Sequence, residues 1–118
     1  HDVCNDISLS LEDFENLKDS SLYLPIKKMM GHYIDGIQTF EKTTGALMYD
    51  PLAAYYLINP EAYKIEPMDI KIETMSELTR GMTVADRRVW GDKEPNIDVV
   101  ASINREAFIK DFFEILKK

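Results

Sequence analysis

The hydrophobic positions of residues 26–40 repeat with the period of an α-helix. Apolar side chains recur at every third or fourth position, which gathers them into one stripe along a helix. The stripe consists of Ile26, Met29, Met30, Tyr33, Ile34, Ile37 and Phe40. Ser20 or Ser21 can cap the start of this helix ahead of Pro25, and Gly45 marks its end or a position just beyond it. The pattern predicts a long amphipathic helix, which is the clearest element of the sequence.

Shorter elements are predicted on both sides of this helix. Residues 1–9 have the character of a short extended stretch, and Ser10 can cap a short helix that reaches about Lys18, with Asp13 three residues after the cap. Asp50 is expected to cap a further helix over residues 51–59, since proline is favoured at the first helical position. That helix is apolar on most sides, which predicts deep burial.

After residue 60 the period of the pattern changes to two. Residues 70–74 alternate between apolar and charged side chains, which predicts a half-buried strand. Residues 78–86, with Gly81 as a bulge or close-approach point, and residues 97–103 predict two further strands. Asn104 is expected to cap a final helix with an inward face made of Phe108, Ile109, Phe112, Phe113 and Leu116. The sequence thus predicts a mixed α/β fold whose sheet continues into residues outside this chain.

Composition and charge narrow the classes of function. The chain has 118 residues, enough for one domain, with 14 basic and 21 acidic residues and a net charge of −7. Its lysines and arginines never cluster beyond pairs, so we expect no nucleic-acid binding. No apolar stretch approaches the ~20 residues that span a bilayer. The first residues lack a signal-peptide pattern, and the single Cys4 excludes an internal disulfide, so we expect a cytoplasmic protein.

The chemistry-bearing residues do not by themselves make an active site. Asp50 is interpreted first as a helix cap and second as a metal ligand, but calcium needs about six to eight oxygen ligands and no acidic cluster accompanies this residue. His32 lies beside the apolar stripe, and Tyr33 and Tyr49 are of a type more often found in a core or at its rim. The sequence contains no catalytic serine motif and no glycine-rich phosphate loop. These residues alone indicate a soluble α/β segment.

Two longer strings resemble a known family. Residues 49–58, which read YDPLAAYYLI, resemble the H-D-P-L-A-x-x-Y-L-I segment of the inosine–uridine-preferring nucleoside hydrolases. Residues 72–88, IETMSELTRGMTVADRR, resemble the V-E-T-x-G-E-L-T-R-G-x-T-V-V-D segment of that family. Residues 96–99 fit the strand that follows, and residues 2–4 are similar to a family strand that ends in D-V-T. The matches occur in the family's order and identify residues 1–118 as the C-terminal portion of such a domain.

The resemblance implies a fold, an activity and a cofactor. The fold is mixed α/β, with the main parallel sheet largely outside this chain. The activity is hydrolysis of the N-glycosidic bond of ribonucleosides, with Ca²⁺ holding the nucleophilic water and the ribose hydroxyls. The family's N-terminal D-T-D-x-G-x-D-D motif, which supplies most calcium ligands and the water-activating aspartate, is absent from these 118 residues. We therefore expect the chain to be inactive alone and the full-length protein to form a homodimer or homotetramer.

Three residues of this chain match functional positions of the family. Asp50 matches the late calcium ligand, and Tyr49 stands where many members place the histidine that protonates the leaving base. Tyrosine, with an unperturbed pKa of ~10 against ~6.5 for histidine, is the poorer acid near neutrality, but its ring can stack on a base. Tyr33 is a candidate contact to the base. Some purine-selective members carry an aromatic residue before this aspartate, so we expect a purine-leaning specificity.

Two alternatives remain open from the sequence. The tyrosine at position 49 also suits a catalytically silent relative that binds nucleosides. A helical protein-interaction module unrelated to nucleosides is the other alternative.

Overall fold

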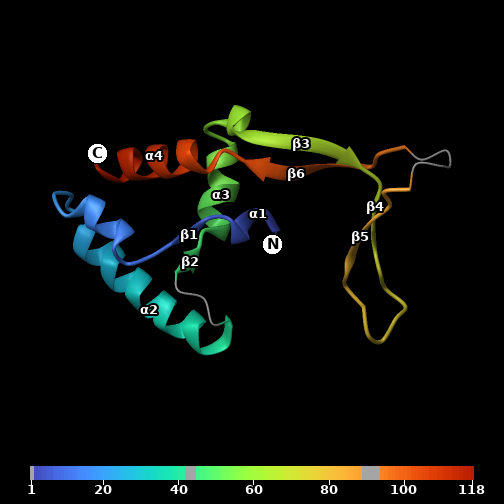
Figure 1. Ribbon diagram of the computed structural model, residues 1–118, viewed down its shortest axis with the longest axis horizontal. Coiled ribbons are helices and arrows are strands. Elements are labelled where there is room, and N and C mark those ends of the chain that lie inside the picture. Colours follow the sequence, from blue (N-terminus) through green and yellow to red (C-terminus); the bar gives the residue numbers. More distant parts are fainter. Residues whose placement is uncertain (1, 42–44, 89–93) are drawn as a thin grey trace. The chain divides into compact units, whose positions relative to one another are not determined.

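The computed structural model describes residues 2–41, 45–88 and 94–118, which form two compact units (Figure 1). Unit 1 comprises residues 1–63 and 103–118, and unit 2 comprises residues 64–102. Each unit is described by itself. The mixture of helices and strands confirms the predicted α/β class.

Unit 1 contains most of the helices. Its elements are α1 (Asp2–Asn5), β1 (Ser8–Leu9), the 3₁₀ helix η1 (Asp13–Leu17), α2 (Tyr23–Glu41), β2 (Ala46–Leu47), α3 (Tyr49–Tyr56), the 3₁₀ helix η2 (Pro60–Ala62) and α4 (Arg105–Leu116). The short strands β1 and β2 pair antiparallel, with Ser8 opposite Leu47 and Leu9 opposite Ala46. This pair runs across the core of unit 1, so it lies at the centre of the unit although it is only two residues long.

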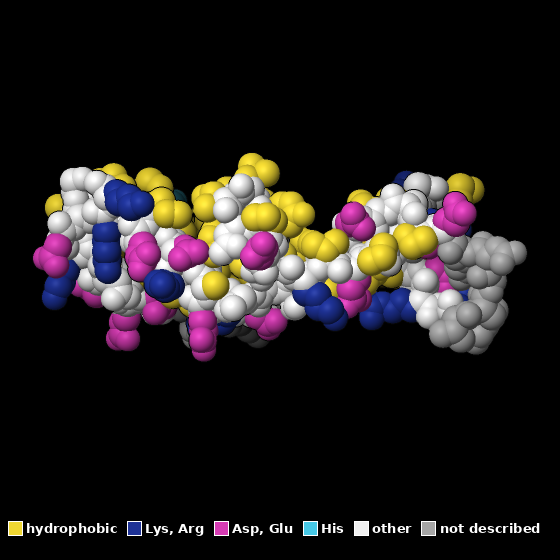
Figure 2. Space-filling view, turned by 90° about the horizontal axis from the view of Figure 1, so that it is seen from above, with side chains coloured by type: hydrophobic (Ala, Val, Ile, Leu, Met, Phe, Trp, Pro, Cys, Tyr) yellow, Lys and Arg dark blue, Asp and Glu magenta, His cyan; other side chains and the backbone are white. Residues whose placement is uncertain are grey.

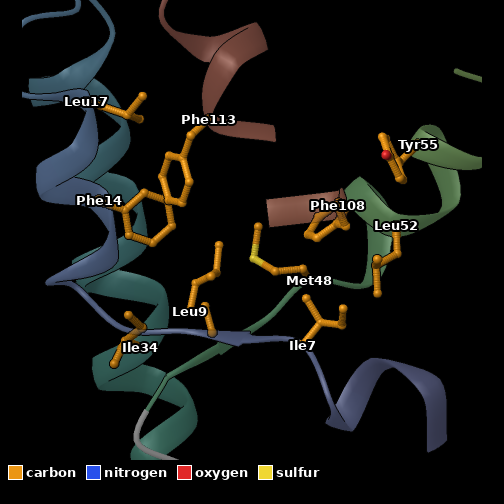
Figure 3. Packing of buried hydrophobic residues seen from close by; sticks show 11 residues of the cluster. Ile7, Leu9, Phe14, Leu17, Ile34, Met48, Leu52, Tyr55, Phe108 and Phe113 are labelled. Carbon is orange, nitrogen blue, oxygen red and sulfur yellow. The ribbon is translucent and has the colours of Figure 1, made fainter. Parts of the chain in front are cut away.

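The core of unit 1 joins β1, η1, α3 and α4 (Figure 3). The largest fully buried side chains are Phe14, Phe108, Ile7, Leu9 and Leu17. The Phe14 and Phe113 rings meet edge to face with centroids 6.0 Å apart, and Phe108 meets Tyr55 in the same way at 5.3 Å. Edge-to-face contacts at these distances stabilise aromatic pairs beyond the area they bury. Through them α4 holds both η1 and α3 in place.

The predicted cap at Asn104 is confirmed by its hydrogen bond. The predicted cap at Ser10 was wrong, because the short helix η1 begins at Asp13 with Glu12 at its N-cap position and no side-chain cap hydrogen bond. The Ser10 backbone N–H and hydroxyl both donate to Asp13 Oδ2, at 2.7 and 2.8 Å, while Asn104 Oδ1 accepts from the Ala107 backbone N–H at 3.1 Å. The Asn104 contact satisfies a backbone N–H that the start of α4 leaves without a partner, and the Ser10 contacts fix the turn ahead of η1. Residues 1–9, in contrast, are not one extended stretch, because residues 2–5 form α1 before the chain turns into β1.

The prediction for α3 was wrong in its start and in its burial. The Met48 carbonyl accepts from the Leu52 backbone N–H at 3.1 Å, so the first turn already begins at Tyr49 and Asp50 lies inside it rather than capping it. The helix ends at Tyr56. Within it only Leu52 and Tyr55 are buried, because the helix contacts the core of unit 1 on one face alone.

The predicted apolar stripe of α2 is divided between the core and solvent. The helix itself is confirmed over Tyr23–Glu41, and Ile34 is buried. Met29, Tyr33 and Phe40, however, are 65%, 38% and 87% exposed. The seven stripe positions span a wider arc of the helix than the core covers.

Gly45, predicted at the end of the long helix or just beyond it, lies after α2 at a close approach of the chain to β1. A Cβ atom at this position would lie 2.8 Å from the Leu9 carbonyl oxygen and against the Ser8 hydroxyl. Only glycine fits this approach of the chain to β1 without displacement. The end of α2 at Glu41 is followed by residues 42–44, which lie outside the described residues.

Unit 2 consists of strands and turns. Its strands are β3 (Tyr63–Met68), β4 (Ile70–Ile72), β5 (Thr83–Ala85) and β6 (Ile97–Ile103). β3 lies beside β6, and β4 pairs antiparallel with β5. The sequence predicted β6 correctly and missed β3. The strand predicted over residues 78–86 is shorter in the structure, where only β5 is a strand. Residues 77–81 form a turn instead, in which Gly81 has a φ of 87°.

Candidate functional site

The candidate site lies where β2 leads into α3. Ala46, Leu47 and Met48 are all buried, and the Met48 backbone N–H donates to the Ile7 carbonyl at 3.3 Å. This segment is therefore fixed by β1 and by the core beneath it. Tyr49 and Asp50 follow as the first two residues of α3.

Asp50 presents an accessible carboxylate. Its side chain is exposed, and within the described residues it has no hydrogen-bond or ion-pair partner. A carboxylate in the first turn of a helix is favoured by the partial positive charge of that end, typically by ~0.3–1 kcal/mol. The fold thus holds this carboxylate on a rigid element and leaves its oxygens open to a ligand.

The two tyrosines lie on different helices. Tyr49 is half-buried in the same turn as Asp50, while Tyr33 is 38% exposed on α2, which packs against β2. No hydrogen bond, ion pair or ring contact among the described residues joins Tyr33 to Asp50. Tyr49 and Asp50 thus share the first turn of α3, whereas Tyr33 lies on α2.

The described residues contain no complete calcium site. Calcium takes about six to eight oxygen atoms, mostly from carboxylates and carbonyls. Across residues 2–41, 45–88 and 94–118, no three His, Cys, Asp or Glu side chains converge on a common point. Asp50 fits this chemistry as a single hard oxygen ligand. The remaining ligands would have to come from other residues.

Two tyrosine hydroxyls that the sequence reasoning missed hold α3 in place. The Tyr55 hydroxyl donates to Asp111 Oδ2 at 2.6 Å and accepts from Asn59 Nδ2 at 3.0 Å. The Tyr63 hydroxyl donates to the Leu52 carbonyl at 2.5 Å. The signal for the first contact was the acidic Asp111 among the apolar residues of the final helix.

Both hydroxyls keep their protons throughout the neutral pH range. Burial, followed by the hydrogen bond to Asp111, raises the pKa of Tyr55. Burial also raises the pKa of Tyr63 to about 12. Loss of either proton would place a charge in a poorly solvated position, so these hydroxyls remain donors under physiological conditions.

Comparison with known proteins identifies the family. The model of the inosine-uridine preferring nucleoside hydrolases matches residues 1–110. The chain belongs to this nucleoside hydrolase family. The match confirms the resemblance inferred from residues 49–58 and 72–88. It rules out the alternative of a helical module unrelated to nucleosides.

The relatives of this nucleoside hydrolase chain are much longer than the chain itself. It is 30% identical over 113 residues to the pyrimidine-specific ribonucleoside hydrolase RihA of Shewanella oneidensis, covering 92% of the chain and 35% of that protein. The purine-preferring ribonucleoside hydrolase of Gardnerella vaginalis superposes with a TM-score of 0.82 at 20% identity, covering 98% of the chain and 37% of that structure. A plant nucleoside hydrolase gives a TM-score of 0.83 at 15% identity, covering 98% and 39%. The chain therefore has the fold of about one third of these proteins.

Proposed function

We propose that this chain is the C-terminal part of a calcium-dependent ribonucleoside hydrolase, which converts a nucleoside to the free base and ribose. The observation that carries the proposal is the exposed carboxylate of Asp50, which has no partner among the described residues and is held in the first turn of α3. It lies within residues 49–58, the string that resembles a family motif, and inside the family match over residues 1–110.

In this proposal the Asp50 carboxylate provides one oxygen ligand of the calcium site. When bound, the calcium ion would hold the attacking water and the ribose hydroxyls. β2 and the core fix the backbone that carries Asp50, so the carboxylate is preorganised for its ligand. Because one carboxylate cannot hold calcium, we expect the isolated chain to bind calcium no more tightly than millimolar and to hydrolyse no nucleoside.

In this proposal Tyr49 and Tyr33 contact the base of the bound nucleoside. Tyr49 directly precedes Asp50 in the first turn of α3, so it is an aromatic side chain next in sequence to the proposed metal ligand. An aromatic ring in this position favours stacking on the large face of a purine. The names of the relatives divide between a pyrimidine-specific and a purine-preferring enzyme, and the tyrosine is the reason for proposing the second preference here.

The assignment of Asp50 is tested in the polypeptide that carries this chain together with the rest of a hydrolase domain. The exchange Asp50→Asn should lower the calcium affinity and the rate of inosine hydrolysis by at least about 100-fold, since removing even an indirect partner of a metal ligand costs ~10–100-fold. Asp35→Asn is the matched control, because Asp35 is an exposed acid on α2. Unchanged calcium affinity in the Asp50 variant would overturn the assignment.

The function of Tyr49 is tested by exchanging it for phenylalanine. If the ring stacks on the base, Tyr49→Phe keeps the kcat/KM for inosine within about threefold. If the hydroxyl protonates the leaving base, the same exchange lowers kcat by ~10²–10⁴-fold and moves the basic limb of the pH profile. Kinetics with inosine and uridine test the specificity, and a clear preference for uridine would contradict the purine assignment.

A catalytically silent nucleoside-binding protein is the second candidate. Tyr49 at the position of the family's proton-donating histidine favours it. Calorimetry that shows inosine binding without release of the base would support this candidate over the enzyme. Cytoplasmic location and assembly into a homodimer or homotetramer are further proposals for the full-length protein. Among the described residues, no helix has both the length and the apolar character that a bilayer-spanning segment needs.

A further inference from the structure

The first turn of α3 is closed without a side-chain cap. Met48 occupies the N-cap position, and no side chain there accepts a hydrogen bond from the turn. The Leu52 backbone N–H closes the turn by donating to the Met48 carbonyl at 3.1 Å, and Asp50 lies midway between these two residues. A helix as short as α3 is marginal by itself. The position of Asp50 therefore depends on the contacts that hold Met48 and Leu52.

Both ends of this turn are tied to other segments of unit 1. At its start, the Met48 backbone N–H donates to the carbonyl of Ile7, the residue before β1, at 3.3 Å. At its end, the Tyr63 hydroxyl donates to the Leu52 carbonyl at 2.5 Å. In an α-helix this carbonyl also accepts from the N–H four residues later, so the hydroxyl uses its second lone pair. Asp50 is thus held between two contacts from outside the helix.

The Tyr63 hydroxyl belongs to a ring that is itself held in place. This ring meets the Tyr56 ring almost at right angles, with centroids 5.2 Å apart, and it meets the Tyr55 ring at 6.0 Å. The backbone next to it is also fixed, because the Asn104 N–H donates to the Ala62 carbonyl at 2.7 Å. A donor whose own side chain is locked by its neighbours can orient another group precisely.

Charge contributes little to the placement of α3. Asp50 is the one charged residue of this helix, and no ion pair between described side chains includes it. Charged side chains of both signs, coloured dark blue and magenta, are scattered over the face drawn in Figure 2 rather than gathered in one patch. The placement of the first turn therefore depends on hydrogen bonds and packing.

We propose that Tyr63 is a positioning residue of the metal site, whose hydroxyl fixes the turn that presents the Asp50 carboxylate by holding the Leu52 carbonyl. The inference rests on the proposed function. Asp50 is only two positions from Leu52, so a displacement of that carbonyl also displaces the carboxylate. Removing a group that orients a metal ligand typically lowers metal affinity ~10–100-fold. The hydroxyl of Tyr63 then matters for calcium binding beyond its contribution to stability.

The test uses the polypeptide that carries this chain with the rest of a hydrolase domain. Tyr63→Phe keeps the ring and removes the hydroxyl, so it should weaken calcium binding, measured by calorimetry, at least ~10-fold. The same exchange should lower Tm by less than ~4 °C, as expected for one hydrogen bond in a large domain. The same calorimetry and thermal unfolding are applied to two other exchanges of tyrosine for phenylalanine.

The two comparison variants separate positioning from stability. Tyr55→Phe removes the 2.6 Å bond to Asp111 from the last turn of α3. It should lower Tm at least as much as Tyr63→Phe, but leave the calcium affinity within about threefold, since it acts at the end of the helix away from Asp50. Tyr56→Phe is the matched control, because Tyr56 touches the Tyr63 ring and is 40% exposed. It should change neither quantity.

Hydrogen exchange in this chain alone gives a measurement that needs no calcium. Tyr63→Phe should speed exchange of the Leu52 amide by ~3–10-fold, because the turn that this amide closes has lost one of its outside contacts. The Phe108 amide, which donates to the Asn104 carbonyl in α4 at 3.1 Å, is the reference and should stay within about twofold. A local change of this kind is what a positioning contact predicts.

Each outcome decides the proposal. A Tyr63→Phe variant that binds calcium as tightly as the parent would overturn it. Equal acceleration of the Leu52 and Phe108 amides, or an equal loss of calcium affinity in Tyr55→Phe, would also overturn it, because the hydroxyl would then act through global stability. The proposed function fails in a different way: if the parent polypeptide binds no calcium, the enzymatic assignment is wrong, and the positioning of a calcium ligand by Tyr63 is refuted with it.

Discussion

Unit 1 and unit 2 are ordered in different ways. Unit 1 has a core in which Phe14 and Phe108 are 1% exposed and Ile7, Leu9 and Leu17 are fully enclosed. In unit 2, no described residue of 64–88 or 94–102 is buried. Burial of apolar side chains therefore stabilises unit 1, and it contributes much less to the stability of unit 2.

Unit 2 depends on local hydrogen bonds instead. The β4–β5 hairpin is closed by the Glu73 N–H, which donates to the Met82 carbonyl at 3.0 Å, and by the Gly81 N–H, which donates to the Glu73 carbonyl at 2.7 Å. An isolated two-stranded hairpin is only marginally stable in water. We conclude that unit 2 opens more easily than unit 1. Exchanges in the two units should therefore have very different effects.

The largest difference is expected between a buried and an exposed side chain. Phe108→Ala should destabilise unit 1 by ~3–5 kcal/mol, because it leaves a cavity beside Tyr55 and Phe112. Leu78→Ala in unit 2 should change stability by less than ~0.5 kcal/mol, since Leu78 is 93% exposed. Urea unfolding followed by circular dichroism measures both. A loss for Leu78→Ala comparable to that for Phe108→Ala would show that the hairpin is packed in solution.

The next effect concerns the close approach of the chain to β1. Gly45→Ala should cost ~1–3 kcal/mol, because the new Cβ meets the Leu9 carbonyl oxygen at 2.8 Å and one segment must move. Gly36→Ala is the matched control, since no atom lies within 4 Å of its added Cβ in α2. That exchange should raise stability by up to ~1 kcal/mol through helix propensity. Thermal unfolding that ranks the two variants in the opposite order would contradict the steric argument.

The amino-acid pattern predicted elements that depend on local chemistry. Ser10 with Asp13 and Asn104 with Ala107 are contacts over three residues, so the sequence contains both partners of each contact. The α2 period was equally visible. β3 was missed because its alternation of apolar and charged residues over 63–66 is short and is followed by Pro67, which is unfavourable in a strand. Its order also depends on pairing with β6, about 30 residues away.

The sequence predicted less of the candidate site than of the helices and strands. The sequence placed Tyr49 and Asp50 next to each other at a helix start, and the structure places both in the first turn of α3. It did not predict that Met48, rather than Asp50, is the N-cap residue of α3, since the position of Met48 depends on the Ile7 carbonyl 41 positions earlier. The hydroxyl contacts of Tyr55 and Tyr63 are also long-range. Such contacts appear only when the helices are packed.

A moderate effect is expected from the buried hydroxyl that joins α3 to α4. Tyr55→Phe should cost ~1–2 kcal/mol, because it removes the 2.6 Å bond to Asp111 while leaving the ring in its place. Tyr56→Phe removes a hydroxyl from a residue that is 40% exposed and should be nearly neutral. A double-mutant cycle with Asp111→Asn measures the coupling between the two side chains. Additive losses in that cycle would show that the contact contributes nothing to stability.

The smallest effect is expected in unit 2, at the turn after β4. Glu73 Oε1 accepts from the backbone N–H groups of Met75 and Ser76 at 2.6 and 3.0 Å, and these bonds lower the pKa of Glu73 from its ordinary value of 4.5. A lowered folded pKa means that the carboxylate stabilises the turn above pH ~4.5 and loses this contribution as the pH falls through the folded pKa.

The measurement is the pH dependence of the Met75 and Ser76 amide signals in NMR spectra between pH 6 and pH 2. In the parent chain both amides should shift together as the carboxylate takes up its proton, with a midpoint below 4.5. Glu73→Gln keeps an acceptor oxygen at this position without the charge, so the shared shift should disappear while β4 and β5 stay paired. A midpoint at or above the ordinary value would mean that the turn is open in solution, and the contrast between the two units would then extend from packing to hydrogen bonding.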